Sequence, residues 1–262
     1  MKPSEIFDIV KLAKVMALRA LLGSSEFDYL DTKFYFNPST SLLEPITKEA
    51  HVILSLNWRN IYYSWWIDSS KIRDHYTNNT NFFVNLLYKD KIFYAEYLKQ
   101  LKIYSSTNFY EKIIKNNQKQ FNNNIKLLKN NYPTKKVFSL EHLKTTRIRV
   151  NDVLSPVEGL NAYFENFSDG VVRLAIHNIQ RLPIEVIGIE LDNGQKILIQ
   201  EPIFIYGKKP LKPTVSKQIE LKCKEIFDCN KKSIERQKVI YRILGQKNEK
   251  TVMILPFYHI KN

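Results

Sequence analysis

Several carboxylates gather between Leu12 and Glu49, where together they could bind a cation. An apolar stretch comes first, a loop containing Glu26 and Asp31 follows it, and Glu49 comes after an extended aromatic segment. If Glu26, Asp31 and Glu49 face one cleft, their charges repel and raise at least one pKa unless a cation is bound. The alternative is that these acids are ordinary exposed loop residues.

Other arrangements that support catalysis or metal binding do not occur in the sequence. The five histidines show neither HxxxH nor HExxH spacing, and there is no GxSxG, GxGxxG or Walker motif. Cys223 and Cys229 have five residues between them, which fits no common zinc or redox spacing. They would form a disulfide in an exported protein or remain free thiols.

A helix and a hairpin are the elements that must position the acids. Over residues 5–22 apolar side chains cover most of a helical surface, which predicts a buried helix. Gly23 is the expected stop, because glycine adopts a positive φ at little steric cost. The aromatic residues at 33–36 predict a strand that enters a core. After a turn at residues 37–41, the segment 42–46 should return as its hairpin partner.

This part of the chain resembles a known family. The pattern LAKxxAL, a polar loop and then FYFNPSTSLLEPI is similar to the CotH kinase family of atypical bacterial protein kinases. The resemblance continues at residues 87–98, where LYKDKIFYAEYL is similar to the helix that follows in those proteins. It covers about half of the chain and corresponds to the C-terminal part of a kinase-like domain. A helical region resembling a kinase C-lobe is therefore implied.

The resemblance also implies roles for three acids, although the family's active-site pattern is altered. Asp31 stands where those proteins carry an asparagine, Glu49 stands at their metal-binding aspartate, and Ser25 or Glu26 falls at their histidine. Glu26 and Asp31 are thus the candidate catalytic residues, and Asp31 and Glu49 are the candidate metal ligands. The implied cofactors are Mg²⁺ and ATP, and carboxylate oxygens are ligands that Mg²⁺ accepts. The implied reaction is phosphoryl transfer to a protein.

Length and leader signals limit the classes of protein to consider. The 262 residues suffice for one large domain or two modest ones, and no charge-free apolar run is long enough to predict a membrane span. The first residues lack the features of a secretory signal peptide. Because CotH-like proteins are often exported or membrane-anchored, the resemblance suggests an extracytoplasmic or cell-envelope location if the chain is a fragment. Its partner would then be a missing N-terminal kinase lobe or another protein.

The net charge of +14 favours an anionic partner. The segment from Lys112 to Lys136 has seven lysines and no acid, on a helix that Asn108 and Glu111 are expected to cap as a capping box. Its lysines would hold phosphates or acidic lipids, or else they form a solvated helix face. Nucleic-acid binding is not expected, because the segment has no interleaved arginine that could read bases.

The placement of glycines and a change in the period of the hydrophobic pattern mark a domain boundary near residue 155. Only Gly23 of the seven glycines precedes residue 159, and short β-branched runs then replace the helical periodicity. The expected fold is α+β, with a mainly helical region at residues 1–155 and an antiparallel β-sandwich at residues 156–262. Residues 192–194, Asp-Asn-Gly, predict a type I′ hairpin turn. The expected strands are residues 160–165, 171–177, 184–191, 196–200, 215–221, 238–244 and 251–257.

Two functions of different classes remain open. The first is a partial or divergent CotH-like protein kinase that is inactive as this chain alone, because the covering loop and lysine of a kinase have no counterpart before Gly23. The second is a non-catalytic cell-envelope structural or protein-binding module, in which the helical half serves as a scaffold for the β half. Fold ancestry does not decide activity, and the substituted polar positions favour the second function.

Overall fold

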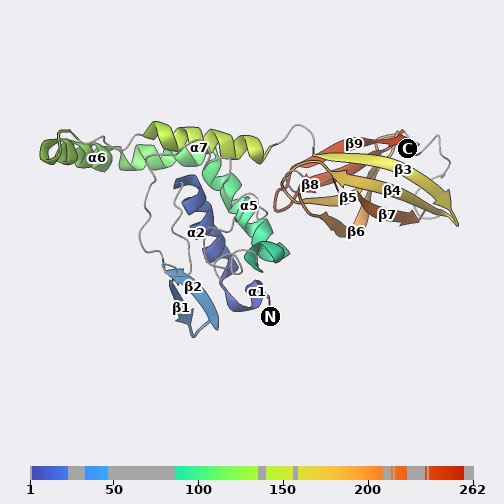
Figure 1. Ribbon diagram of the computed structural model, residues 1–262, viewed down its shortest axis with the longest axis horizontal. Helices are drawn as coiled ribbons and strands as arrows, with labels where there is room; N and C mark the ends of the chain where they lie inside the picture. The colour runs from blue at the N-terminus through green and yellow to red at the C-terminus, as the bar shows by residue number, and fades with distance from the viewer. Residues whose placement is uncertain are drawn as a thin grey trace. The chain divides into compact units, whose positions relative to one another are not determined.

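The computed structural model describes residues 2–22, 33–46, 86–134, 140–155, 159–208, 214, 216–222, 234 and 236–256. The chain divides into two compact units, Met1–Ser155 and Pro156–Asn262. Figure 1 shows that the described residues of the first unit are mainly helical and that those of the second form a sheet. Because helices and strands are segregated in this way, the fold class is α+β.

The first expected helix is present but interrupted near its start. Helix α1 spans Pro3–Ile6 and α2 spans Ile9–Leu22, and Phe7 between them is extended. The side chain of Asp8 caps α2, because its Oδ1 accepts a hydrogen bond from the Lys11 amide at 3.0 Å. Hydrophobic periodicity alone does not reveal this break, because it reports which side of a helix is apolar and not where the backbone leaves the helix.

A β-hairpin follows in the order that the sequence predicts. Strands β1 (Lys33–Asn37) and β2 (Leu42–Ile46) pair antiparallel, and Ser41 in the turn has a φ of 56°. The expectation that the aromatic residues of β1 enter a core is wrong for Tyr35 and Phe36, which are 53% and 55% exposed. Neighbouring strand residues point to opposite faces, so both faces of the hairpin are exposed toward its turn.

Helix α5 (Lys91–Ser105) packs on α2 and builds the core of the first unit. Small alanine side chains on α2 let the two helices approach closely. Helix α7 (Leu140–Val153) contacts both, and Lys102 of α5 donates to Asn151 Oδ1 of α7 at 2.8 Å. The buried apolar residues of the two helices include Leu12, Ala13, Met16, Ala17 and Ala20 on α2, and Phe93, Tyr97, Leu98 and Leu101 on α5.

The long basic helix is also present, as α6 (Thr107–Asn131), but its cap differs from the expected one. The hydroxyl of Ser106 accepts a hydrogen bond from the Phe109 amide at 3.3 Å. The predicted capping box of Asn108 and Glu111 is therefore wrong, since Asn108 already lies in the first turn. None of the residues of α6 is buried, and Figure 1 shows its far end beyond the other labelled elements of the first unit.

The second unit is one mixed sheet, which corrects the expected antiparallel β-sandwich. Its described residues form seven strands, hydrogen-bonded in the order β6-β5-β8-β9-β3-β4-β7. Every neighbouring pair is antiparallel except β3 and β9, which are parallel. The strands themselves lie close to their predicted positions: β3 (Leu160–Ser168), β4 (Val171–Asn178), β5 (Ile184–Glu190), β6 (Lys196–Ile205), β7 (Ser216–Lys222), β8 (Lys238–Ile243) and β9 (Glu249–Pro256).

This sheet curls until its two edge strands meet, so that it is close to a barrel. Lys217 on β7 donates to the carbonyl oxygen of Phe204 on β6 at 2.9 Å. Register shifts in β3 and β5 are irregularities of the kind that bend a sheet. At the second of them, a side chain in place of Gly188 would put its Cβ 2.3 Å from the Ile197 carbonyl oxygen, so this strand contact needs glycine.

Two hairpin turns combine aspartate with glycine, and only one has the type I′ conformation. Asp169 and Gly170, between β3 and β4, have φ values of 55° and 72°, which is what a type I′ turn requires. At the predicted site, residues 192–194, only Gly194 has a positive φ, of 82°. The Leu191 carbonyl accepts from the Gly194 amide at 2.9 Å. This hairpin therefore closes through a three-residue loop with a glycine bulge, and the type I′ prediction is wrong there.

Candidate functional site

The acids predicted to form the site, Glu26, Asp31 and Glu49, lie outside the described residues. The structure does describe the hairpin from which two of their segments start. Lys33, the first residue of β1, pairs with Ile46, the last residue of β2. The segments that carry Asp31 and Glu49 are therefore attached to the same end of one hairpin.

The hairpin is held against the start of the first unit by backbone and aromatic contacts. Phe7 forms a parallel β-bridge with Leu43, and the Asp8 amide donates to the Leu43 carbonyl at 2.9 Å. The rings of Phe7 and Phe34 lie 5.0 Å apart at an angle of 50°. The break between α1 and α2 is thus used to add an extended residue beside β2, which fixes the hairpin relative to α2.

Glu44 adds a polar contact between the hairpin and α2. Its Oε1 accepts from Asn37 Nδ2 at 2.7 Å, and its Oε2 lies 2.6 Å from Lys11 Nζ. Asn37 also accepts a hydrogen bond from the Ser39 amide at 2.9 Å, which stabilises the turn. Both carboxylate oxygens of Glu44 and both ends of the Asn37 amide are therefore occupied within the protein. Asn37 and Glu44 of the FYFNPSTSLLEPI segment have structural roles.

The pKa values of Glu44 and Lys11 are shifted in the directions that their hydrogen bonds predict. The hydrogen bond from Asn37 and then the one from Lys11 lower the pKa of Glu44, because both stabilise the ionised carboxylate. The hydrogen bond to Glu44 raises the pKa of Lys11 for the same reason. The Lys11 side chain is about half exposed, so the pair orients the hairpin more than it stabilises the fold.

The second stretch that resembles CotH kinases is also explained by capping and packing. Asp90 caps α5 by accepting the Ile92 amide at 2.9 Å, and its other oxygen accepts the Ser4 amide at 2.9 Å. Burial alone would raise the pKa of Asp90, but the hydrogen bonds from Ser4 and the α5 amides outweigh it and lower the pKa. Phe93 and Tyr97 are fully buried in the core. Asp90 therefore joins α1 to α5.

One charged residue of α2 was not predicted to have a functional role. Arg19 lies in the last turn of α2 and is only 7% exposed, although it is a cation. Arginine is rarely buried without partners, because removing its charge from water is costly. Its signal in the sequence is a charge within an otherwise apolar helix surface. The structure thus brings a buried guanidinium to the end of the helix that precedes the acidic segment.

Within the described ranges, no cluster of three or more His, Cys, Asp or Glu side chains is suitable for a metal ion. His177 packs edge-on against the Tyr163 ring, 5.3 Å between centroids. Cys223 and Cys229 lie outside the described residues. No helix in the described part of the chain is both long and apolar enough to cross a membrane.

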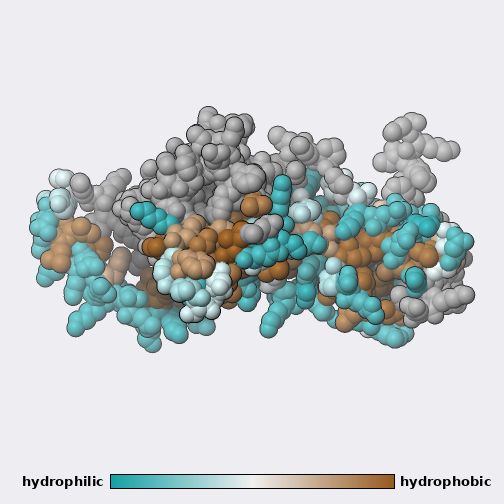
Figure 2. Space-filling model, turned by 90° about the horizontal axis from the view of Figure 1, so that it is seen from below, coloured by the Kyte–Doolittle hydropathy of each residue, from teal (hydrophilic) through white to brown (hydrophobic). Residues whose placement is uncertain are grey.

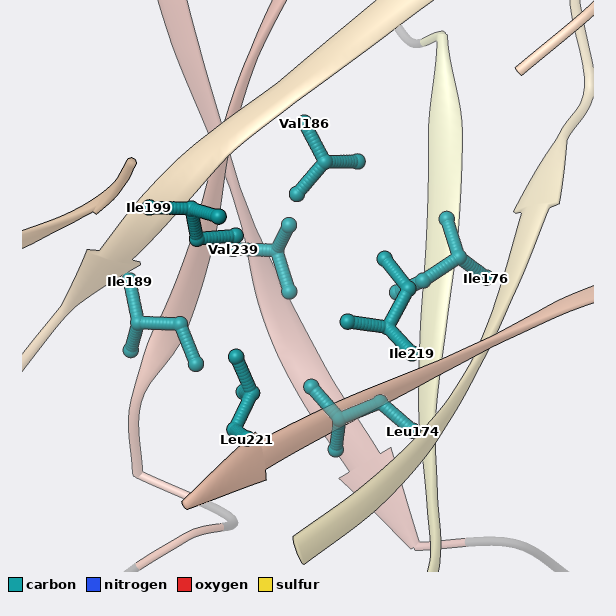
Figure 3. A pocket seen from close by; sticks show the side chains of 8 residues that line it. All are labelled: Leu174, Ile176, Val186, Ile189, Ile199, Ile219, Leu221 and Val239. Carbon is teal, nitrogen blue, oxygen red and sulfur yellow. The ribbon is translucent and has the colours of Figure 1, made fainter. Parts of the chain in front are cut away.

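The interior of the curled sheet is a packed core. Figure 3 shows aliphatic side chains from β4, β5, β6, β7 and β8 pointing toward a common centre, and they leave no room there for a water molecule. An interior without polar groups offers a ligand no hydrogen bond. The side chains are Leu174, Ile176, Val186, Ile189, Ile199, Ile219, Leu221 and Val239.

The basic segment predicted between Lys112 and Lys136 lies mostly on α6. Five of its seven lysines are on this helix, and Lys135 and Lys136 lie outside the described residues. The predicted binding role concerned only the lysines of this segment, and the apolar residues between them were given none. A count of apolar spacings would have shown a seven-residue period in the same stretch.

Comparison of the chain with family models, with curated proteins and with solved structures finds no match.

Proposed function

We propose that the first unit is a divergent member of the CotH kinase lineage, with a kinase-C-lobe-like helical region that binds a magnesium nucleotide. Asp31 and Glu49 hold the Mg²⁺ ion, and Glu26 and Asp31 face the phosphates. The observation that carries the proposal is the hairpin register. Lys33 pairs with Ile46, and Asp31 and Glu49 stand two residues before and three residues after this pair. The segments that carry both metal-ligand candidates are therefore attached to the same end of the hairpin, which supports the proposal.

The contacts of Glu44 support this choice of ligands. Glu44 belongs to the same segment, but Asn37 and Lys11 engage both of its oxygens, so it anchors the hairpin. The acids that flank the anchored hairpin are then the ones left to bind a cation. Carboxylate oxygens suit Mg²⁺, which commonly uses one or two protein carboxylates together with substrate phosphates.

The chain alone is not expected to transfer phosphate. Transfer requires a covering loop over the phosphates, a lysine on a neighbouring strand and metal held by acids. Residues 2–22 form α1 and α2, and the first glycine is Gly23, so the described residues before the hairpin supply neither the loop nor the lysine. Each 1.4 kcal/mol of lost transition-state stabilisation lowers the rate about tenfold.

Thermal denaturation with Mg²⁺ and ATP tests the binding site. Bound ligand should raise the Tm of the chain relative to chelator, because ligand that binds only the folded state stabilises it. Asp31→Asn and Glu49→Gln should abolish this rise, whereas Asp152→Asn on α7 should keep it. An unchanged Tm in millimolar Mg²⁺ and ATP, together with no effect of Asp31→Asn, would show that these acids are ordinary loop residues.

Labelling with radioactive ATP tests the expected lack of transfer. The purified chain should label neither itself nor a casein-like substrate. Stoichiometric labelling that Glu49→Ala abolishes would overturn this part of the proposal and make the chain a self-sufficient kinase.

A second candidate function is a non-catalytic module that binds a protein partner, in the cell envelope or elsewhere. The observation that favours it is α6, which has no buried residue and on which Ile113, Leu127 and Leu128 are exposed. This function does not require nucleotide binding, so both properties can be measured separately on one protein.

A further inference from the structure

Helix α6 contains a seven-residue repeat, which has no part in the nucleotide proposal. Residues 111–131 read EKIIKNN, QKQFNNN and IKLLKNN. The second position is always lysine, the fourth is always apolar, and the last two are always asparagine. A period of seven keeps equivalent residues on one side of two helices that wind around each other.

The apolar positions of this repeat form a stripe that is partly exposed: Ile114, Phe121 and Ile125 are half-buried. Leu128 and Tyr132 are 47% and 53% exposed, and no residue of α6 is buried. Figure 2 shows hydrophobic residues bordered by hydrophilic ones at the left of the view, where α6 lies. Helices α2 and α5, by contrast, each have several fully buried apolar residues. The heptad stripe consists of Ile114, Phe121, Ile125, Leu128 and Tyr132.

The lysines of the repeat lie along one side of the heptad stripe. They occupy the second and fifth positions, whereas the asparagines of the seventh position lie on the other side and those of the sixth lie at the back of the helix. None of these lysines forms an ion pair in the described part of the chain. The lysine flank consists of Lys112, Lys115, Lys119, Lys126 and Lys129.

The period of the repeat favours a helix as the partner over a membrane surface. A helix lying on a flat surface has no reason to keep a period of seven, because an ideal helix drifts by about 20° per heptad from such a pattern. A membrane-surface helix also gains from basic residues around its polar face. Here the lysines lie on one flank only, and the other flank carries asparagines together with Ile113 and Leu127.

The charge of α6 favours an acidic partner over a second copy of the chain. Its five lysines and one acid, Glu111, give a helix charge of 5 − 1 = +4, and the whole chain carries +14. An antiparallel pair of two copies would place lysine flank against lysine flank. A parallel pair would place the lysine flank against asparagines, without attraction. An acidic helix would instead place carboxylates against Lys115 and Lys129, the lysines nearest the seam.

We propose that α6 is a docking surface for an amphipathic acidic helix of another protein. The apolar heptad residues of that helix pack on the heptad stripe, and its Glu or Asp residues lie against the lysine flank. This inference does not depend on Glu26, Asp31 or Glu49.

Binding of synthetic peptides to the full chain tests the proposal. The probe is a peptide of about four heptads, with leucine at both apolar positions and glutamate at both flanking positions, long enough to be helical. Its controls are the same peptide with lysine in place of glutamate, and a peptide with its apolar positions scrambled. The glutamate peptide should bind at least about tenfold more tightly than either control, a difference of about 1.4 kcal/mol.

Variants of the full chain locate the site. Phe121→Ser with Leu128→Ser should weaken binding of the glutamate peptide at least about tenfold, with circular dichroism confirming that α6 stays helical. Lys115→Glu with Lys129→Glu should reverse the preference, so that the lysine peptide binds more tightly. Lys222→Glu with Lys247→Glu changes the net charge by the same amount at exposed sites of the second unit, and should keep the original preference.

Several results would overturn the proposal. Equal loss of binding in the Lys222→Glu, Lys247→Glu variant would mean that overall charge, and not the lysine flank, attracts the peptide. Binding to phosphatidylserine vesicles without binding to the glutamate peptide would make α6 a membrane-surface helix. A stable dimer of the chain in sedimentation experiments, abolished by Phe121→Ser with Leu128→Ser, would make the partner a second copy.

Discussion

Single residues in the segments that resemble CotH kinases have structural roles in this protein. Asn37 and Glu44 hold the hairpin to Lys11, and Asp90 joins α1 to α5. A sequence pattern does not distinguish a carboxylate that binds a ligand from one that caps a helix, because both are polar residues beside apolar ones. Asn37, Glu44 and Asp90 therefore act in local folding.

Asp90 should make stability depend on pH in the acidic range. Replacing it with alanine removes the cap of α5 and the hydrogen bond to Ser4, so the free energy of unfolding at pH 7 should fall by about 1 kcal/mol or more. Because the pKa of Asp90 is lowered in the folded state, its contribution is present above the unfolded pKa of about 4. It is lost as the pH falls through the folded pKa.

Urea denaturation at pH 7 and near pH 3 measures this effect. The difference between wild type and Asp90→Ala should shrink at the lower pH, and Asp90→Asn, which keeps an acceptor oxygen, should lose less at pH 7. Asp152→Asn on the exposed side of α7 is the control. A difference between wild type and Asp90→Ala that does not change with pH would contradict the assigned role.

At the scale of elements, the turns show how local sequence and backbone conformation can differ. Two aspartate-glycine segments look alike, yet Asp169 has a positive φ and Asp192 does not. The reason is the loop between the paired strands: two residues separate Ser168 from Val171, whereas five separate Glu190 from Lys196. The pairing of the strands selects the turn type. The residues in the turn then determine how much free energy that conformation costs.

Substitutions at the two aspartates test this assignment. Asp169→Ala should lower the free energy of unfolding by about 1 kcal/mol, because a residue with a Cβ is disfavoured at positive φ and alanine lacks the polar side chain that eases it. Asp192→Ala should change it by less than about 0.5 kcal/mol, as expected for an exposed position with ordinary backbone angles. Equal effects in urea denaturation would show that both turns have the same conformation.

At the scale of the whole molecule, the chain consists of two compact units, and the boundary between them in the sequence lies between Ser155 and Pro156. The core of the first comes from helices α2 and α5, and the core of the second comes from the curled sheet. A unit that has its own core is expected to fold alone. The nucleotide proposal and the α6 proposal both concern the first unit, so the second can be removed to test them.

Expression of residues 1–155 and 156–262 as separate chains tests this independence. Each fragment should fold, and the sum of their circular dichroism spectra should match that of the full chain. Mild proteolysis of the full chain should cut between about Asn151 and Gly159. A fragment that is unfolded alone but folds when mixed with the other would contradict the prediction and reveal a large shared interface.

The sequence by itself determined the elements and where they lie. The helix over α2, the hairpin of β1 and β2, and the seven later strands all follow from local signals, since apolar period, turn residues and glycine placement act within a few residues. The candidate acids also came from the sequence, and the described residues supply only the hairpin that flanks them.

Tertiary structure alone decided how these elements meet. The parallel pairing of β3 with β9, the curl that brings Lys217 to Phe204, and the break at Phe7 beside Leu43 all join residues distant in the chain. An alternating pattern shows which face of a strand is apolar. The pattern is the same whether the strand pairs in parallel or antiparallel, and whichever strand it pairs with. The partial exposure of the heptad stripe on α6 was decided in the same way, because periodicity predicts an apolar side and only packing shows how much of it is covered.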